Sequence, residues 1–112
     1  MIIAIPVTGG RLSAHFGHCE SFAFFEADGQ DGAPKLIKTE PAPAHAPGLL
    51  PQWLSEQGAE VIIAGGMGRR AQMLFEQSGI QVVVGAPLEE PQTLAGQYGA
   101  GTLATGANMC DH

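Results

Sequence analysis

Imidazole and thiol side chains lie close together in one early loop of the sequence. Residues 8–20 follow an apolar run and contain His15, His18 and Cys19 within five positions. These side chains supply the nitrogen and sulfur ligands that zinc, copper and iron–sulfur centres use. The spacing therefore predicts a metal site in this loop. The alternative is that each histidine makes local hydrogen bonds and that Cys19 packs as a small buried hydrophobic residue.

The end of the chain carries the same types of ligand. Cys110 and His112 stand two positions apart, beside Met109. Ligands this close in sequence cannot complete a tetrahedral site alone, so a shared centre requires the tail to reach the first loop. His45 is a further candidate ligand, although an isolated histidine is more often a surface or capping residue. We expect free thiols or thiolate ligands rather than a disulfide, because disulfides are rare in cytosolic proteins.

A glycine-rich turn is the third candidate. Residues 65–70 read Gly-Gly-Met-Gly-Arg-Arg and open a predicted helix. Glycines before a helix let backbone N–H groups approach an anion, and the helix N-terminus adds positive partial charge. Arginines are unfavourable there for the helix itself, which indicates a ligand. The residues that we expect to contact an anion are Arg11, Gly65, Gly66, Met67, Gly68, Arg69 and Arg70.

A simpler interpretation of this turn stays open, in which the glycines only reverse the chain and the arginines pair with surface acids. Nucleotide binding has little support, because residues 65–70 lack the G-x-x-x-x-G-K-[ST] pattern of a P-loop. The turn also lacks the G-x-G-x-x-G fingerprint of a dinucleotide site.

The elements that would position these residues follow from apolar runs and helical spacing. Short apolar runs typical of buried strands are Ile2–Val7, Val61–Ala64 and Gln81–Val84, and a hairpin is predicted from Ser21–Glu26 and Lys35–Thr39. Helices are predicted around 49–54, 71–78 and 91–98. We therefore expect an α/β fold with a mixed sheet of about five strands and three flanking helices. The loops at 8–20 and 65–70 should meet at the carboxyl ends of their strands.

Length and charge limit the classes of function. A chain of 112 residues predicts one domain over residues 1–112, in which 99–112 form a tail that is either flexible or ordered by a ligand. The net charge of −6 leaves no broad basic face for nucleic acid or an anionic membrane. The N-terminal Met-Ile-Ile-Ala-Ile run lacks the basic region of a signal peptide. We expect a cytoplasmic protein.

Catalytic groups are harder to assemble from this sequence. Ser13 lies near His15 and His18 but lacks the G-x-S-x-G pattern of a nucleophile elbow. The acidic residues form no cluster on a predicted strand that would support two-metal chemistry. We therefore predict that the protein is not an enzyme. An enzyme acting on a phosphate-containing substrate through the glycine-rich turn ranks last among the hypotheses.

Four stretches of the sequence form a recognisable set: Arg11-Leu12-Ser13-x-His15-Phe16-Gly17-x-Cys19-x-x-Phe22, His45, Gly58-x-x-Val61-Ile62-Ile63-x-Gly65-Gly66-Met67-Gly68, and Gly79-Ile80-x-Val82. With these residues the chain resembles the dinitrogenase iron–molybdenum cofactor biosynthesis family, and in particular its small, free-standing, orange-protein-like members. The resemblance implies a ribonuclease-H-like fold. It also implies a carrier or scaffold for metal–sulfur clusters of the iron–sulfur, iron–molybdenum or molybdenum–copper sulfide type, with cluster donor and acceptor proteins as partners.

Two hypotheses of binding function follow. In the first, a metal–sulfur cluster or its precursor lies between the loop at 11–19 and the turn at 65–70, with the tail as an optional third side. In the second, the protein is a regulatory or interaction domain that holds a simple zinc or copper ion. The ligands in that case would be His15, Cys19, Cys110 and His112. Visible colour separates the two, because a molybdenum or iron sulfide cluster absorbs visible light and a zinc site does not.

Overall fold

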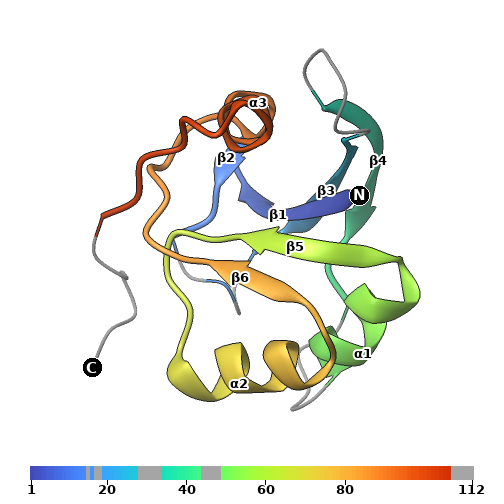
Figure 1. Cartoon of the computed structure of the whole chain (residues 1–112). Coiled ribbons are helices and arrows are strands. Elements are labelled where there is room, and N and C mark those ends of the chain that lie inside the picture. Colours follow the sequence, from blue (N-terminus) through green and yellow to red (C-terminus); the bar gives the residue numbers. More distant parts are fainter. Residues whose placement is uncertain (15, 17–18, 28–33, 44–48, 107–112) are drawn as a thin grey trace.

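The computed structural model describes residues 1–14, 16, 19–27, 34–43 and 49–106. Four strands come first in the chain, helices and strands then alternate, and together they form a sheet with helices on both faces (Figure 1). The elements are β1 (Ile2–Thr8), β2 (Arg11–Leu12), β3 (Ser21–Glu26), β4 (Lys35–Pro41), α1 (Leu49–Glu56), β5 (Ala59–Ile63), α2 (Arg69–Gln77), β6 (Gln81–Val83) and α3 (Pro91–Ala100).

The sheet is mixed, as the sequence predicts. Its strands follow the order β4-β3-β1-β5-β6, and β2 pairs with β1 away from this path. The β1–β3 and β3–β4 pairs are antiparallel, whereas the β1–β5 and β5–β6 pairs are parallel. Leaving out the two-residue β2, the five main strands have the arrangement of a ribonuclease-H-like fold, with antiparallel meander strands on one side and crossover strands on the other. The expected fold class is confirmed.

The two faces of the sheet are covered by different helices. Phe24 of β3 points into a cluster that contains Leu54 of α1 and Phe75 of α2. Its neighbour Phe25 points the other way, into a cluster that contains Leu94 of α3. This alternation is the period of two of a β-strand, and both faces are apolar because each carries helices. Figure 1 shows α3 on one side of the sheet and both α1 and α2 on the other.

Aromatic rings connect the early loop to the core on the α1–α2 side. The ring of Phe16 packs edge to face against the rings of Phe75 and Phe22. The distances between ring centroids are 5.3 Å to Phe75 and 5.7 Å to Phe22. The ring centroid of Phe22 in turn lies 5.5 Å from that of Trp53. Edge-to-face pairs of this kind contribute about 0.5–1.5 kcal/mol each beyond their buried area. The loop that carries the candidate ligands is therefore fixed to the core at one position.

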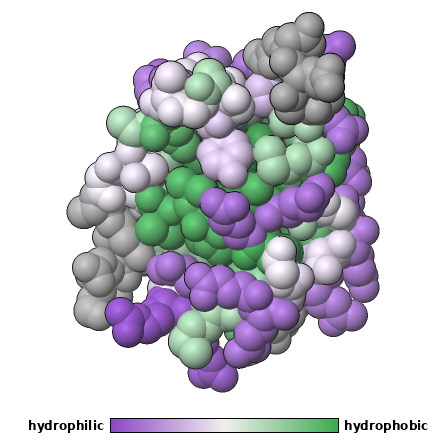
Figure 2. Space-filling view, in the orientation of Figure 1, coloured by the Kyte–Doolittle hydropathy of each residue, from purple (hydrophilic) through white to green (hydrophobic). Residues whose placement is uncertain are grey.

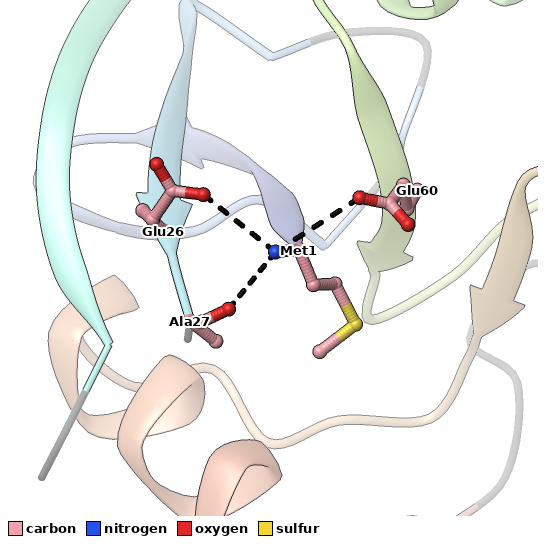
Figure 3. A network of polar contacts seen from close by, with 4 residues as sticks. All are labelled: Met1, Glu26, Ala27 and Glu60. Carbon is pink, nitrogen blue, oxygen red and sulfur yellow. Dashed lines mark hydrogen bonds and ion pairs between the residues drawn. The ribbon is translucent and has the colours of Figure 1, made fainter. Parts of the chain in front are cut away.

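The opposite end of the sheet is held by the chain terminus. The amino group of Met1 donates to the carbonyl of Ala27 at 2.9 Å (Figure 3). It also lies 3.6 Å from a carboxylate oxygen of Glu26 and 4.0 Å from one of Glu60. Both carboxylates are more than half exposed, so each ion pair contributes little to stability. These contacts join β3 and β5 across β1 and leave the other strand ends for the candidate site.

Apolar surface reaches the outside beside the last strand. Green atoms gather between α3 and α2, over the region of β5 and β6 (Figure 2). Val82, Val83 and Val84 on this edge are half-buried. Across the part of the chain that the structure describes, no helix is long and apolar enough to cross a membrane.

Candidate functional site

The two loops predicted to meet follow neighbouring parallel strands. β1 and β5 are neighbouring parallel strands, so the loops that follow them leave the sheet at the same end. After β1, Gly9 and Gly10 adopt φ angles of 63° and 80°. Positive φ at both central residues permits the tight turn that pairs Thr8 with Arg11. This turn creates β2 and starts the early loop.

A backbone hydrogen bond joins the early loop to the glycine-rich turn, and another joins the loop to β1. The N–H of Phe16 donates to the carbonyl of Gly66 at 3.1 Å, and the N–H of Ser13 donates to Pro6 at 2.9 Å. A side chain on Gly65 would lie 3.2 Å from Leu88 and 3.4 Å from the carbonyl of Ser13. Gly65 therefore allows a close approach of the two loops, and the prediction that they meet is confirmed.

The glycine-rich turn ends in an open helix N-terminus. Gly68 is the N-cap of α2, and no side chain caps the helix. A Cβ on Gly68 would meet nothing within 4 Å, so the space beside the N-cap residue is open in the described region. The first N–H groups of a helix have no partner inside the helix. They therefore remain available to an anion, which the positive end of the helix dipole also favours.

The three arginines at this edge have no acidic partner among the residues that the structure describes. Arg69 and Arg70 are exposed in the first turn of α2, which contains no acid. Arg11 donates to the carbonyl of Leu88 at 3.3 Å rather than to a carboxylate. The ion pairs of the described region all involve the amino group of Met1. The interpretation in which these arginines pair with surface acids gains no support from the described residues.

Met67 and Cys19 differ from the exposed members of the predicted set. Met67 is 1% exposed and packs in the core cluster on the α1–α2 side, so its side chain acts there as a hydrophobic residue. Cys19 is a free, half-buried thiol packed against the same cluster. Burial raises the pKa of the Cys19 thiol from its ordinary value of 9.0 to about 11, partly opposed by a backbone hydrogen bond. The thiol is therefore protonated near neutral pH, and a metal must displace that proton.

The remaining predicted ligands lie outside the described residues. These are His15, His18, His45, Cys110 and His112. Among the residues that the structure does describe, no three His, Cys, Asp or Glu side chains gather as a metal site would require. The ligand prediction therefore stays a prediction.

Two supporting residues carry no motif that the sequence alone would reveal as part of a site. Gln72 donates through Nε2 to the carbonyl of Met67 at 2.9 Å and through its backbone N–H to Gly68 at 3.1 Å, which fixes the turn from within α2. Glu20 accepts a hydrogen bond from the N–H of Gly9 at 3.0 Å, and its own N–H donates to Val7 at 2.9 Å. The sequence feature that could have indicated Glu20 is its position directly after Cys19. An acidic side chain there can accept a hydrogen bond from the turn after β1 and so hold the end of the loop against that turn.

Fold and site together define a small ribonuclease-H-like protein with a glycine-rich turn and an uncapped helix N-terminus at the carboxyl ends of its parallel strands. The chain belongs to the dinitrogenase iron–molybdenum cofactor family, whose sequence model matches residues 1–101. This membership links it to the biosynthesis of metal clusters.

Three individual proteins show how far the similarity extends along the chain. An uncharacterized protein of Methanocaldococcus jannaschii is 35% identical over 85 residues, which cover 73% of this chain and 72% of that protein. The crystal structure of the protein PH0822 superposes with a TM-score of 0.86 at 28% identity and covers 97% of both chains. The apo form of the orange protein from Desulfovibrio gigas superposes with a TM-score of 0.69 at 22% identity, covering 96% of this chain and 93% of that one. The last likeness concerns the fold alone.

Proposed function

We propose that this protein binds and transfers a metal–sulfur cluster, or an anionic precursor of one, during the assembly of a metallocofactor. The observation that carries the proposal is the open N-terminus of α2. Gly68 leaves the first N–H groups uncapped, and Arg69 and Arg70 stand beside them without an acidic partner in the described region. An anion is the ligand that this arrangement favours.

The chemistry of the site fits a sulfide-rich anion. Sulfide or oxide atoms of such a cluster accept hydrogen bonds from backbone N–H groups, and the arginines offset its negative charge. A thiolate from Cys19 is a soft ligand suited to iron or copper. Since the pKa of this thiol is raised by burial, the thiol gives up its proton only when a metal replaces it. The protein itself binds and orients the cargo, and we propose no catalytic step.

The first test is loading of the purified protein. Protein isolated without oxygen is mixed with iron and sulfide, or with tetrathiomolybdate and copper, and the product is analysed by visible absorption and elemental analysis. A coloured complex of fixed stoichiometry is expected, and its colour should be lost in a H15A/C19S double variant. A colourless protein that takes up only zinc, or nothing, would contradict the proposal and favour a simple metal-binding domain.

A matched pair of glycine substitutions tests the helix N-terminus specifically. Gly68 and Gly96 both have negative φ and open space where a Cβ would lie, but only Gly68 borders the turn. G68A should weaken loading because its methyl group occupies the approach to the N-cap. G96A, inside α3, should load normally and gain about 0.5–1 kcal/mol of stability from improved helix propensity. Equal loading of the two variants would refute the role of the N-cap.

A further inference from the structure

The two edge strands of the sheet differ in the features that usually prevent strand pairing. β4 at one edge contains Lys35, Lys38 and Pro41, and its register with β3 is irregular after Phe24. Charged residues, proline and bulges are the devices by which edge strands avoid pairing with other chains. β6 at the other edge, Gln81–Val83, has no charge, no proline and no irregularity in its pairing with β5. Within the described part of the chain, this edge is therefore open to a further strand.

The outward-facing backbone groups of this edge belong to two valines. The carbonyl of Val83 accepts from the N–H of Ala64 at 2.8 Å, so Val83 directs its backbone groups toward β5. Backbone groups of successive strand residues point to opposite edges, so Val82 and Val84 direct theirs away from the sheet. Such a row of N–H and C=O groups is a template for another strand. All three valines are half-buried, and Figure 2 shows apolar surface over β5 and β6, between α3 and α2.

The helix beside this edge carries opposite charges on one side. α2 packs on β6, and its Leu74 and Gln77 line a shallow groove with α1. Arg69 and Glu76 stand seven positions apart, so they share one side of α2, turned away from that groove and toward the β6 edge. Both are exposed, and neither forms an ion pair with a described residue. A second α2 that runs in the opposite direction would place unlike charges opposite one another.

We propose that β6 is a dimerisation edge, at which a second copy of this chain pairs antiparallel through the same strand. With a twofold axis at Val83, Val82 of each copy lies opposite Val84 of the other, and each such pair exchanges two backbone hydrogen bonds. The same axis places Arg69 of one copy beside Glu76 of the other. The edge is thus complementary to itself in both hydrogen bonding and charge. This inference does not depend on the proposed function.

Charge and closure both favour a dimer at this edge. Each copy has a net charge of −6, so two copies repel one another unless they meet at a surface without excess negative charge. Pairing of β6 with β6 uses this edge in both copies, and the charged, irregular β4 edge does not extend the sheet further. A strand of three residues and one helix side form a small interface, so we expect a dissociation constant between about 10 µM and 1 mM. The glycine-rich turns of the two copies would lie at opposite ends of the joined sheet.

The first test measures mass against protein concentration by sedimentation equilibrium. Wild-type protein should move from 11.6 kDa toward twice that mass as the concentration rises. V82P removes an outward-facing N–H and leaves the hydrogen bonds to β5 in place, because proline is tolerated where an edge strand faces outward. It removes two hydrogen bonds from each dimer and should weaken association about tenfold or more. V82T keeps the N–H and the branched shape, and it should associate nearly as well as wild type.

Charge reversal on α2 tests the same arrangement without changing β6. Glu76 is exposed, so its variants should fold. E76R places like charges opposite one another and should weaken the dimer by about threefold to tenfold at low salt, with E76Q between E76R and wild type. The double variant R69E/E76R restores unlike pairs and should recover the wild-type dissociation constant. Added salt should reduce the differences among these proteins.

Amide hydrogen exchange locates the interface on the strand. The N–H groups of Val82 and Val84 should exchange rapidly in dilute protein and slowly in concentrated protein, whereas that of Val83, which faces β5, should be protected in both.

Four results would overturn the inference. The first is a wild-type protein that stays monomeric up to about 1 mM. The second is a V82P protein that folds and dimerises as well as V82T. The third is an R69E/E76R protein that associates no more tightly than E76R. The fourth is protection of Val82 and Val84 in dilute protein, because the chain itself would then cover the edge.

Discussion

Replacing the first arginine of α2 should change stability and cargo binding in opposite directions. With Gly68 as the N-cap, Arg69 and Arg70 occupy the first two helical positions, where positive charge opposes the helix dipole. Each unfavourable charge costs about 0.3–1 kcal/mol at an exposed position. R69Q should therefore stabilise the apo protein by that amount. For a chain of 112 residues this corresponds to an increase in Tm of about 1–5 °C.

The same substitution should weaken the hold on an anion. At about 4 Å in a water-like environment, each pair of unit charges contributes about 1 kcal/mol, which is about fivefold in affinity. A cargo with more than one negative charge should lose more. Because both partners are exposed to solvent, the loss should shrink as ionic strength rises. The assay is thermal unfolding of the apo protein together with visible-absorption measurement of cargo release at two salt concentrations.

K35Q is the matched control for this pair of measurements. Lys35 is exposed at the start of β4 and lies opposite Glu26 in the β3–β4 register, at the sheet end away from the turn. Either substitution changes the formal net charge from −6 to −7, so a general charge effect would appear in both. A lower Tm in R69Q would refute the helix-dipole argument. Release at low salt that matches K35Q would refute the assignment of Arg69 to cargo binding.

Two further predictions concern the early loop. Because the pKa of Cys19 is raised from 9.0 to about 11, the unfolded chain loses the thiol proton first, and stability should fall between pH 9 and pH 11. The loss should be about 1 kcal/mol after allowance for partial exposure, and urea unfolding of C19S should lack it; parallel pH profiles of the two proteins would contradict this. F16A should lose about 3–5 kcal/mol of stability, because the ring of Phe16 is buried against Phe22 and Phe75. F16L should lose much less, and equal urea midpoints for the two variants would show that the loop does not depend on this anchor.

The elements of the fold were largely predictable because apolar runs and helical spacing are local signals. The hairpin from Ser21 to Pro41 and all three helices appear where the sequence predicts them, with ends shifted by a few residues. The short strand β2 was missed because its two residues carry no periodic pattern. Its formation depends on Gly9 and Gly10, whose positive φ values reverse the chain directly after β1. The irregularity in the β3–β4 register, after Phe24, depends on pairing between strands and has no local signal either.

The candidate site was predictable only in part, for a related reason. The Gly65–Arg70 turn was found because it breaks a local rule: two arginines occupy a helix N-terminus. The N–H of Gly106 donates a hydrogen bond to the carbonyl of Gly85, and this contact breaks no local rule. It arises only when β6 and the segment after α3 come together, so the sequence alone gives no reason to pair these two glycines. Met67 was included for its sulfur, whereas the structure packs it in the core because the turn directs that side chain inward.

A site built mainly from backbone N–H groups and exposed arginines is suited to transfer under the proposed function. Each exposed charge pair contributes only about 1 kcal/mol, so no single contact from Arg11, Arg69 or Arg70 holds the cargo irreversibly. Tight retention then has to come from soft ligands such as Cys19, whose raised pKa makes binding compete with a proton. An acceptor protein that offers thiolates of ordinary pKa would compete well for the metal. Retention should therefore depend more on the thiols than on the arginines, and the C19S and R69Q variants rank these two contributions directly.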